Sequence, residues 1–386
     1  METLSKYRSV KRAYGLDEIA LVPNRTTVDP EDVDISSVIA GIRLEVPIIA
    51  SAMDGVVDVK TAVLMSKLGG LGVLNLHGVQ TRYEDPSEIL KKIGSVSTTE
   101  YVELMQEIYK EPIKPHLIAK RVQEIKQQGG KAVVSSIPQD AETLGPIVQE
   151  AGADAFLVQS TVVSVGHFSS KFESLDITKL VKTLKIPVMV GNCTSYEVAR
   201  SLMETGVSAV FVGVGPGAAC TSRGVLGIGV PMATAIADVV AARLDYFRDT
   251  GRYVSIIADG GIATGGDVCK AIACGADAVM IGSPIAKSQE APGRGYHWGM
   301  ATPNATLPRG TRIKVGTIGT LASILHGPAI YDDGTQNMSG ALKTSMGTLG
   351  AKNLSEMQET EIIIAPSLLT EGKIYQKAQS LGMYHN

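Results

Sequence analysis

Three near-copies of one phrase recur along the chain: GADAFLV at residues 152–158, GVSAVFVG at 206–213 and GADAVMIG at 275–282. In each copy a glycine follows a helical stretch, and an apolar run begins directly after it. A glycine in that position is typical of a helix end, and the apolar run is typical of a buried strand. The phrase therefore marks the passage from a helix to the next strand of a parallel sheet.

The same alternation of strand and helix extends outward from these phrases. Eight short apolar runs are predicted to be strands, at residues 47–51, 72–75, 131–135, 155–159, 187–191, 209–213, 254–259 and 278–282. Helical stretches fill the gaps, including 59–68, 142–151, 195–205, 232–248 and 265–273. Eight alternating units predict a closed (β/α)8 TIM barrel. An open doubly wound sheet fits less well, because SAMDGVVD after the first strand lacks the glycine fingerprint of a dinucleotide-binding domain.

Two stretches interrupt this alternation. Residues 79–130 form a charged, helical connection between the second and third strands, and we expect them to elaborate the helices of the barrel. Residues 285–386 follow the last strand and include a stretch rich in Gly, Pro and Thr. Loops of that length inside an enzyme are usually lids or flaps. We therefore expect one catalytic domain over 1–386, with a mobile flap and tail region at 285–350.

Composition and charge exclude several classes of protein. Lys and Arg number 36 against 39 Asp and Glu, giving a net charge of -3, so neither a nucleic acid nor a membrane surface is expected as a partner. No apolar run reaches the roughly 18 residues of a transmembrane helix, and the N-terminus has no signal-peptide core. The four cysteines lack the spacing of a metal site. We expect a cytoplasmic protein with reduced thiols.

In such a barrel, reactive groups gather where the strands end. The seventh and eighth predicted strands end in Asp259-Gly260-Gly261 and Gly282-Ser283. Glycines there let backbone N–H groups approach a phosphate, Ser283 adds a hydroxyl donor, and Asp259 offers an acceptor to a ribose diol. The pattern indicates a phosphorylated ligand. The alternative is that these glycines only close tight turns.

The most informative segment is the loop after the sixth strand, GVGPGAACTSRGVLGIGVP at residues 213–231. Its glycines and proline form a backbone loop whose carbonyls can face a cation, and it presents Cys220 next to Ser222 and Arg223. A loop thiol beside a basic residue is a candidate nucleophile. The remaining cysteines lack such a loop or lie on a predicted helix: Cys193, Cys269 and Cys274.

Four ordered motifs carry a resemblance to a known family: VPIIASAMD at 46–54, GVGPGAACTSR at 213–223, IADGGIATGGDV at 257–268 and GADAVMIGSP at 275–284. Together they resemble the IMP dehydrogenase/GMP reductase family, and the likeness extends over residues 14–318. The resemblance implies a (β/α)8 barrel that binds a purine nucleoside monophosphate and a nicotinamide cofactor. It also implies assembly as a homotetramer, with an octamer as the alternative.

The resemblance further implies roles for individual residues. Cys220 would be the nucleophile that attacks purine C2 and forms a covalent thioimidate, with Ser222 and Arg309 as its catalytic partners. The nucleotide would be bound by Ser51, Met53, Asn192, Gly217, Asp259, Gly260, Gly261, Gly282, Ser283, Gly299 and Met300. The cofactor would lie beside Gln159, Ser160, Thr161, Gly213 and Gly215. Backbone carbonyls of Gly215, Gly217 and Cys220 would hold a monovalent cation, K+.

Two reactions of the family share this intermediate. IMP dehydrogenase transfers hydride from C2 to NAD+ and then hydrolyses the adduct, whereas GMP reductase expels ammonia first and then accepts hydride from NADPH. The family's dehydrogenases activate water with an adjacent Arg-Tyr pair on a mobile flap, and most carry two regulatory CBS modules. The flap region of this chain has no such pair, since the only arginines after Met300 are Arg309 and Arg312 and neither is followed by a tyrosine. The 79–130 connection is also too short for CBS modules. Both absences favour a reductase.

The chain also departs from the ordinary reductase pattern. Ser222 stands where reductases have a Thr that helps to protonate the departing ammonia, and it keeps the hydroxyl. Arg309 stands at the position of the flap Glu, and a fixed cation cannot act as the same acid–base group. Ala218 replaces a phosphate-binding Ser. Gln159 stands where dehydrogenases have an Asp for the cofactor ribose, and the loss of that carboxylate favours NADPH.

We therefore predict an NADPH-dependent GMP reductase that acts through Cys220. The first alternative is an IMP dehydrogenase in which Arg309 or Arg312 acts with Thr311, and the second is a purine nucleotide-binding regulator without turnover. A flavin-dependent barrel enzyme has a similar phosphate site but would leave the Cys220 loop unexplained. The scattered histidines are not expected to act in catalysis. Trp298, the single tryptophan, is expected either to stack on the purine or to anchor the flap by packing.

Overall fold

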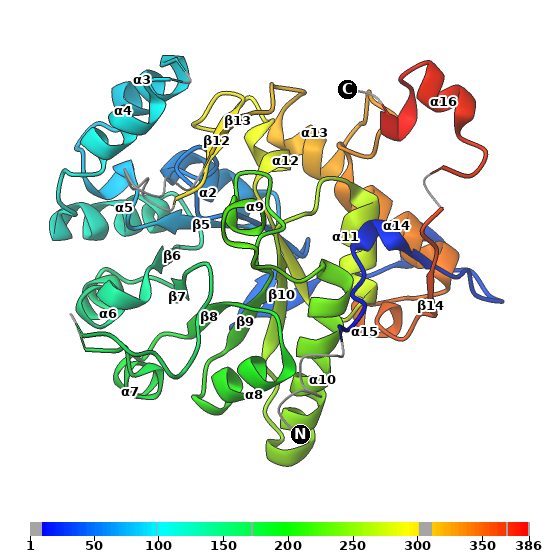
Figure 1. Ribbon diagram of the computed structural model, residues 1–386, viewed down its shortest axis with the longest axis horizontal. Coiled ribbons are helices and arrows are strands. Elements are labelled where there is room, and N and C mark those ends of the chain that lie inside the picture. The colour runs from blue at the N-terminus through cyan, green and yellow to red at the C-terminus, as the bar shows by residue number, and fades with distance from the viewer. Residues whose placement is uncertain (1–9, 98, 171–172, 301–310, 368–369, 385–386) are drawn as a thin grey trace.

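The computed structural model describes residues 10–97, 99–170, 173–300, 311–367 and 370–384. Eight parallel strands close into a barrel (Figure 1): β4 (Ile48–Ala50), β5 (Leu71–Asn75), β6 (Val133–Ser136), β7 (Ala155–Gln159), β8 (Val188–Cys193), β9 (Ala209–Val212), β10 (Ser255–Asp259) and β11 (Ala278–Ile281). Each strand pairs with the next along the chain, and β11 closes the barrel on β4. The predicted (β/α)8 barrel is confirmed, with every strand within two residues of its expected bounds.

Helices that follow the strands form the outer layer of the barrel (Figure 1): α2 (Val59–Lys67), α5 (Pro115–Gln127), α6 (Ala141–Glu150), α7 (Ile177–Thr183), α8 (Tyr196–Glu204), α10 (Met232–Thr250), α11 (Gly265–Ala273) and α14 (Met338–Leu349). The five predicted helices are among them. The glycines of the recurring phrase, Gly152, Gly206 and Gly275, have φ of +87°, +93° and +109°. Glycine adopts that conformation without a steric penalty, so it ends α6, α8 and α11 cleanly before the next strand.

The apolar core has two layers, because successive side chains of a strand point to opposite faces of the sheet. Ile49, Leu157 and Phe211 point into the barrel, whereas Ile48 and Phe156 pack against the surrounding helices. The hairpin of β2 (Ser37–Ile39) and β3 (Ile42–Leu44) contributes its apolar side chains to the inner layer. That hairpin covers the end of the barrel where the strands begin.

Shorter elements complete the fold: the helices α9 (Ser222–Leu226), α12 (Ser283–Ala286), α13 (Leu321–His326), α15 (Leu354–Met357) and α16 (Ile374–Ala378), and the 3-10 turns η1 (Leu16–Glu18), η2 (Pro30–Asp32), η3 (Val79–Thr81), η4 (Pro138–Asp140) and η5 (Gly382–Tyr384). Antiparallel pairs join β1 (Ile19–Leu21) to β14 (Ile362–Ile364) and β12 (Tyr296–Trp298) to β13 (Arg312–Lys314). Within the described ranges, no helix combines the length and the apolar character needed to cross a membrane.

The connection between β5 and β6 contains more than a barrel helix. Before α5 it forms α3 (Ser87–Ser95) and α4 (Tyr101–Ile108), which we call the α3–α4 hairpin, residues 87–108. This hairpin lies outside the helical layer, towards the end of the barrel that carries β12 and β13 (Figure 1). Its apolar side chains form a core of their own around Trp298, which is fully buried. The hairpin is therefore packed on the segment that follows the last barrel strand.

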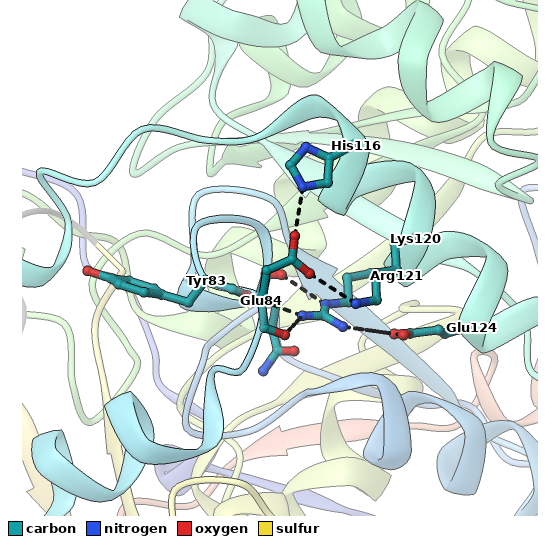
Figure 2. A network of polar contacts seen from close by, with 7 residues as sticks. Tyr83, Glu84, His116, Lys120, Arg121 and Glu124 are labelled. Atoms are coloured by element: carbon teal, nitrogen blue, oxygen red, sulfur yellow. Dashed lines mark hydrogen bonds and ion pairs between the residues drawn. The ribbon is translucent and has the colours of Figure 1, made fainter.

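Arg121 on α5 fastens the chain that leads into the hairpin (Figure 2). Its Nε donates to the carbonyl of Gln80 at 2.9 Å, and its Nη2 donates to the carbonyls of Tyr83 and Glu84 at 3.2 and 2.8 Å. The remaining nitrogen pairs with Glu124 at 3.0 Å. Arg121 is buried, so its donors satisfy carbonyls that water cannot easily reach.

We expect the Arg121→Met variant to lose about 3 kcal/mol of unfolding free energy, because three carbonyls and Glu124 lose a charged donor in a buried place. Lys120→Met is the matched control on the same helix. Its ammonium pairs with Glu84 at 3.0 Å, and both side chains are largely exposed, so the loss should stay below about 1 kcal/mol. Urea denaturation followed by circular dichroism measures both. Equal losses in the two variants would contradict this account of Arg121.

Candidate active site

A cavity of about 510 Å³ opens where the barrel strands end. Every described residue that we expected in the site lines it: Ser51, Met53, Gln159, Ser160, Thr161, Asn192, Gly213, Gly215, Gly217, Cys220, Ser222, Asp259, Gly260, Gly261, Gly282, Ser283, Gly299 and Met300. Arg309 falls outside the described residues. The fold thus gathers residues from both halves of the chain around one space.

Asp259, at the end of β10, is held by two amides. Gln159 Nε2 and Asn192 Nδ2 donate to its Oδ2 at 2.9 and 2.8 Å. No hydrogen bond among the described residues ends on Oδ1. Burial raises the pKa of Asp259 to about 6, because it disfavours the charged carboxylate. The hydrogen bonds from the side-chain amides of Asn192 and Gln159 act in the opposite direction and lower this pKa. Above that pH, Asp259 offers one free carboxylate oxygen to a hydroxyl donor in the cavity.

The strand ends around Asp259 are fixed to one another at Gly213. This glycine has a φ of +141°, and a Cβ there would lie 2.2 Å from the carbonyl oxygen of Asp259. Asn192 Nδ2 also donates to the carbonyl of Gly213 at 2.8 Å. Only glycine permits this approach of backbone to backbone. The ends of β8, β9 and β10 therefore form one rigid floor under the cavity.

The glycine-rich loop after β9 presents Cys220 to the cavity. Its exposed Sγ lies 3.4 Å from the hydroxyl of Ser222, a buried side chain at the start of α9. The N–H of Cys220 donates to the carbonyl of Gly217 at 2.9 Å, which tightens the loop. The guanidinium of Arg223 donates instead to the carbonyl of Val230 at 3.0 Å. Ser222, rather than the neighbouring arginine, is the side chain bonded to the thiol.

The turns after β10 and β11 form another wall of the cavity. Gly260 and Gly261 have φ of +86° and +72°, a conformation that favours glycine. The turn therefore carries no side chain at these two positions. Ser283 begins α12, and its hydroxyl lies 2.9 Å from Nε2 of His297. Burial lowers the pKa of His297 to about 4, so this ring is uncharged at neutral pH. When Nε2 carries the proton, the hydroxyl proton of Ser283 is free to bind an anion.

Our residue-by-residue expectations missed the wall formed after β5 and β6. Asn75 was expected there only as the end of a strand, and the residues that were missed are His77, Arg82, Ser135, Ser136, Ile137 and Gln139. The backbone N–H of Ile137 donates to Nε2 of His77 at 3.2 Å, so that nitrogen must be an acceptor and the neutral ring carries its proton on Nδ1. Burial lowers the pKa of His77, in agreement with the neutral form. From the sequence, only the position of His77 indicated that it would lie in the site, because it follows the end of β5 by two residues.

Packing decides two alternatives that the sequence left open. The guanidinium of Arg312 donates to the carbonyls of Ile93 and Val96 at 2.5 and 2.7 Å and lies over the ring of Tyr101, with 5.3 Å to the centroid. Arg312 is therefore occupied in holding the α3–α4 hairpin. Trp298 is fully buried in the core of that hairpin and does not line the cavity. It anchors by packing and does not stack on a ligand.

A larger cavity, of about 690 Å³, lies at the opposite end of the barrel, where the strands begin. The charged side chains that line it are paired with other side chains or with backbone. Asp277 accepts from Arg243 at 2.8 Å and from the hydroxyl of Tyr253 at 2.5 Å, and Arg252 donates to the carbonyl of Gly206. This end of a barrel contributes to stability, so the candidate active site is the smaller cavity.

Comparisons with known proteins agree with this geometry. The model of a family described as the IMP dehydrogenase/GMP reductase domain matches residues 13–373. An uncharacterized oxidoreductase of Mycobacterium leprae is 39% identical, with 93% of this chain and 98% of that protein covered. The inosine-5'-monophosphate dehydrogenase of Methanocaldococcus jannaschii is 28% identical, with 94% of this chain and 95% of that protein covered.

A solved structure has the same architecture. The crystal structure of an IMP dehydrogenase/GMP reductase-like protein from Corynebacterium glutamicum superposes with a TM-score of 0.87 at 35% identity. The match covers 92% of this chain and 95% of the other. With the family domain matched over nearly the whole chain, the resemblance that the motifs carried is confirmed, and the chain is an oxidoreductase of the IMP dehydrogenase/GMP reductase family.

Proposed function

We propose that this chain is an NADPH-dependent GMP reductase that works through a covalent adduct on Cys220. The observation that carries the proposal is the exposed thiol of Cys220 in the same cavity as the carboxylate of Asp259, with the Ser222 hydroxyl 3.4 Å from the sulfur. The thiol supplies a nucleophile, and the hydroxyl supplies a route for protons. The same groups would serve any member of the family up to the adduct.

The cavity offers a distinct place to each part of a purine nucleoside monophosphate. The free Oδ1 of Asp259 suits the ribose hydroxyls, and the turns at Gly260–Gly261 and Gly282–Ser283 suit the phosphate. Gly299–Met300, which also lines the cavity, suits the base. With ribose and phosphate held in this way, C2 of the purine faces the Cys220 loop.

The proposed reaction begins when the thiolate of Cys220 attacks C2 of GMP. The 2-amino group then leaves as ammonia, having taken a proton by way of Ser222, and a thioimidate joins sulfur to C2. The nicotinamide cofactor supplies a hydride to C2 when bound. Cys220 leaves with the electron pair of its C–S bond and is reprotonated, and IMP is released. In sum, GMP, NADPH and two protons become IMP, NADP+ and ammonium.

The preference for NADPH rests on a neutral side chain. Gln159, at the end of β7, lies beside Ser160 and Thr161 at the cavity wall and donates its amide to Asp259. A carboxylate at this position would repel a 2′-phosphate, and an amide does not.

We include in the proposal a K+ ion held by carbonyls of Gly215, Gly217 and Cys220. Backbone carbonyls suit such an ion, and the described residues contain no cluster of His, Cys, Asp or Glu able to hold another metal.

The proposal extends to the whole chain. It treats residues 1–386 as one catalytic domain without CBS modules, with the region 285–350 as its flap and tail. Residues 301–310 of that region lie outside the described residues, and α14 at its end belongs to the helical layer of the barrel. It treats the protein as a cytoplasmic homotetramer, with the octamer as the alternative, that binds neither nucleic acid nor membrane. Size-exclusion chromatography with light scattering measures the assembly directly.

The second candidate is an IMP dehydrogenase, which converts IMP and NAD+ to XMP. The observation in its favour is the name of a relative, since the similar protein of Methanocaldococcus jannaschii is called an inosine-5'-monophosphate dehydrogenase. It requires a group that activates water. Arg312 is occupied by the carbonyls of Ile93 and Val96, so only Arg309, outside the described residues, is left from the candidates we weighed. A regulator without turnover is the remaining alternative.

Two parallel assays at 340 nm, both with K+, test the function. With GMP and NADPH we expect absorbance to fall, and with IMP and NAD+ we expect no rise. Cys220→Ala should abolish turnover and still bind the nucleotide, because the ribose and phosphate contacts remain. A rise in the second assay alone would establish the dehydrogenase. Nucleotide binding without change in either assay would favour the regulator.

Ser222→Ala should lower kcat for GMP by about 100-fold, because ammonia then departs without a positioned proton donor. The KM for GMP should change little, since Ser222 is not part of the ribose or phosphate contacts. Ser222→Thr keeps the hydroxyl and is the matched control, with kcat expected near that of the native enzyme. Steady-state kinetics separate the two constants. An Ala variant as active as the Thr variant would remove Ser222 from the mechanism.

The pKa of Asp259, about 6, predicts that binding weakens in acid. Above that pH the carboxylate accepts from the ribose hydroxyls, and as the pH falls through 6 the oxygen becomes protonated and the acceptor is lost. The phosphate of the nucleotide titrates near the same pH, at about 6. The comparison with Asp259→Asn removes that common effect. We expect the ratio of KM in Asp259→Asn to KM in the native enzyme to be large at pH 8 and to shrink towards pH 5, and a constant ratio would contradict this role.

A further inference from the structure

One buried carboxylate beside the cavity has no part in the proposed reaction. Asp54 directly follows Met53, a residue of the cavity wall, and only 1% of its surface is exposed. Its Oδ2 accepts from the backbone N–H of Val79 at 2.8 Å and from the hydroxyl of Tyr109 at 2.5 Å. The segment after β4 is thus tied to the residue that follows the α3–α4 hairpin.

These contacts close a ring. The indole N–H of Trp298 donates to the same hydroxyl of Tyr109 at 3.2 Å. Met300 lies two residues after Trp298, and its sulfur accepts a hydrogen bond from the backbone N–H of Asp54 at 3.5 Å. The ring therefore runs from Asp54 through Tyr109 to Trp298 and returns through Gly299 and Met300. Two of its segments, at Met53 and at 299–300, line the cavity and contact each other through Asp54 and Met300.

Backbone packing makes the ring tight. A Cβ on Gly55 would lie 2.8 Å from the carbonyl of Tyr296 and 2.9 Å from Cα of His297, so the two segments touch directly. Gly293 also donates its N–H to the carbonyl of Gly55 at 3.1 Å. A small shift at one segment must therefore move the other.

The α3–α4 hairpin contacts both Trp298 and Arg312. Trp298 is buried among Ile93, Leu104 and Met105 of the hairpin. Arg312 donates to the carbonyls of Ile93 and Val96. The next residue back, Thr311, donates its N–H to the carbonyl of Ala219, beside the nucleophile. The hairpin is thus linked to the base wall and to the Cys220 loop.

We infer that Tyr109 and Asp54 are positioning residues for the reaction, which hold Gly299–Met300 against Met53 so that the purine lies correctly over Cys220. This makes the α3–α4 hairpin a working part of the active site. The inference rests on the proposed function, because it assigns the base to that wall. Misplacement by about 1 Å is enough to slow a reaction markedly, even when the protein stays folded.

The hairpin supplies its own matched control. Tyr101 lies in the same apolar core as Trp298, and its hydroxyl is buried without a hydrogen-bond partner among the described residues. Tyr109→Phe and Tyr101→Phe therefore remove the same atom from neighbouring places. Only the first removal opens the ring between Asp54 and Trp298.

The test combines kinetics with fluorescence of the single tryptophan, which is Trp298 itself. In Tyr109→Phe we expect kcat/KM for the nucleotide to fall at least about tenfold, with the KM of the nicotinamide cofactor nearly unchanged. The emission of Trp298 should change in the free protein, because its N–H loses an acceptor. Nucleotide titrated against the native protein should alter the same emission. Tyr101→Phe should match the native enzyme in every readout.

The outcomes separate the two proposals. A native protein that binds and turns over nucleotide, with Tyr109→Phe equal to Tyr101→Phe, overturns the positioning role and leaves the proposed function standing. A native protein that neither binds nor converts GMP or IMP overturns both. If Tyr109→Phe does not fold, Trp298→Phe removes the other bond of the ring while keeping an aromatic side chain. The same tenfold loss is then expected relative to Tyr101→Phe, and its absence counts equally against the inference.

Discussion

The candidate site depends on one carboxylate oxygen. Oδ2 of Asp259 receives amides from Gln159 and Asn192, which lie 100 and 67 positions earlier in the chain. The bond between strand ends is possible because Gly213 lets β9 approach the backbone of Asp259. This joins the ends of β7, β8, β9 and β10 into one floor, and it leaves Oδ1 free for a ligand. The Cys220 loop begins at that floor, so the position of the nucleophile follows from the same arrangement.

The repetitive part of the molecule could be predicted from the sequence, and the reason is physical. A parallel barrel repeats the same local events, a helix end at a positive-φ glycine followed by a buried strand, and Gly152, Gly206 and Gly275 mark three of them. The strand ends then indicated where a ligand would lie, and the family resemblance supplied the individual residues, which line one cavity. The contacts of Asp54 were beyond such reasoning, since Tyr109 and Trp298 belong to segments whose packing no local pattern announces.

The two flap arginines illustrate the same limit. In the sequence Arg309 and Arg312 are three positions apart and chemically equal, so both were candidates to activate water. The structure distinguishes Arg312, because two carbonyls and the rings of Tyr101 and Tyr296 already surround its guanidinium. A guanidinium held in that way stabilises the packing of the α3–α4 hairpin. His77 shows the converse, since a side chain with no motif around it lines the cavity with its tautomer fixed by the N–H of Ile137.

The barrel floor and the α3–α4 hairpin contact different segments around the cavity, and this difference is relevant to how one family can catalyse two reactions. In the function that we propose, attack by the thiol and binding of ribose and phosphate involve the barrel floor and its adjoining loops, which the contacts of Asp259 and Gly213 join to one another. The two candidate reactions differ in whether water or hydride reaches the adduct. In this chain the α3–α4 hairpin contacts both Trp298, which precedes the cavity residues 299–300, and Arg312, which follows Thr311 at the Cys220 loop. On the positioning role that we infer, a change in the hairpin can alter the base wall at 299–300 while the nucleophile and its floor stay the same.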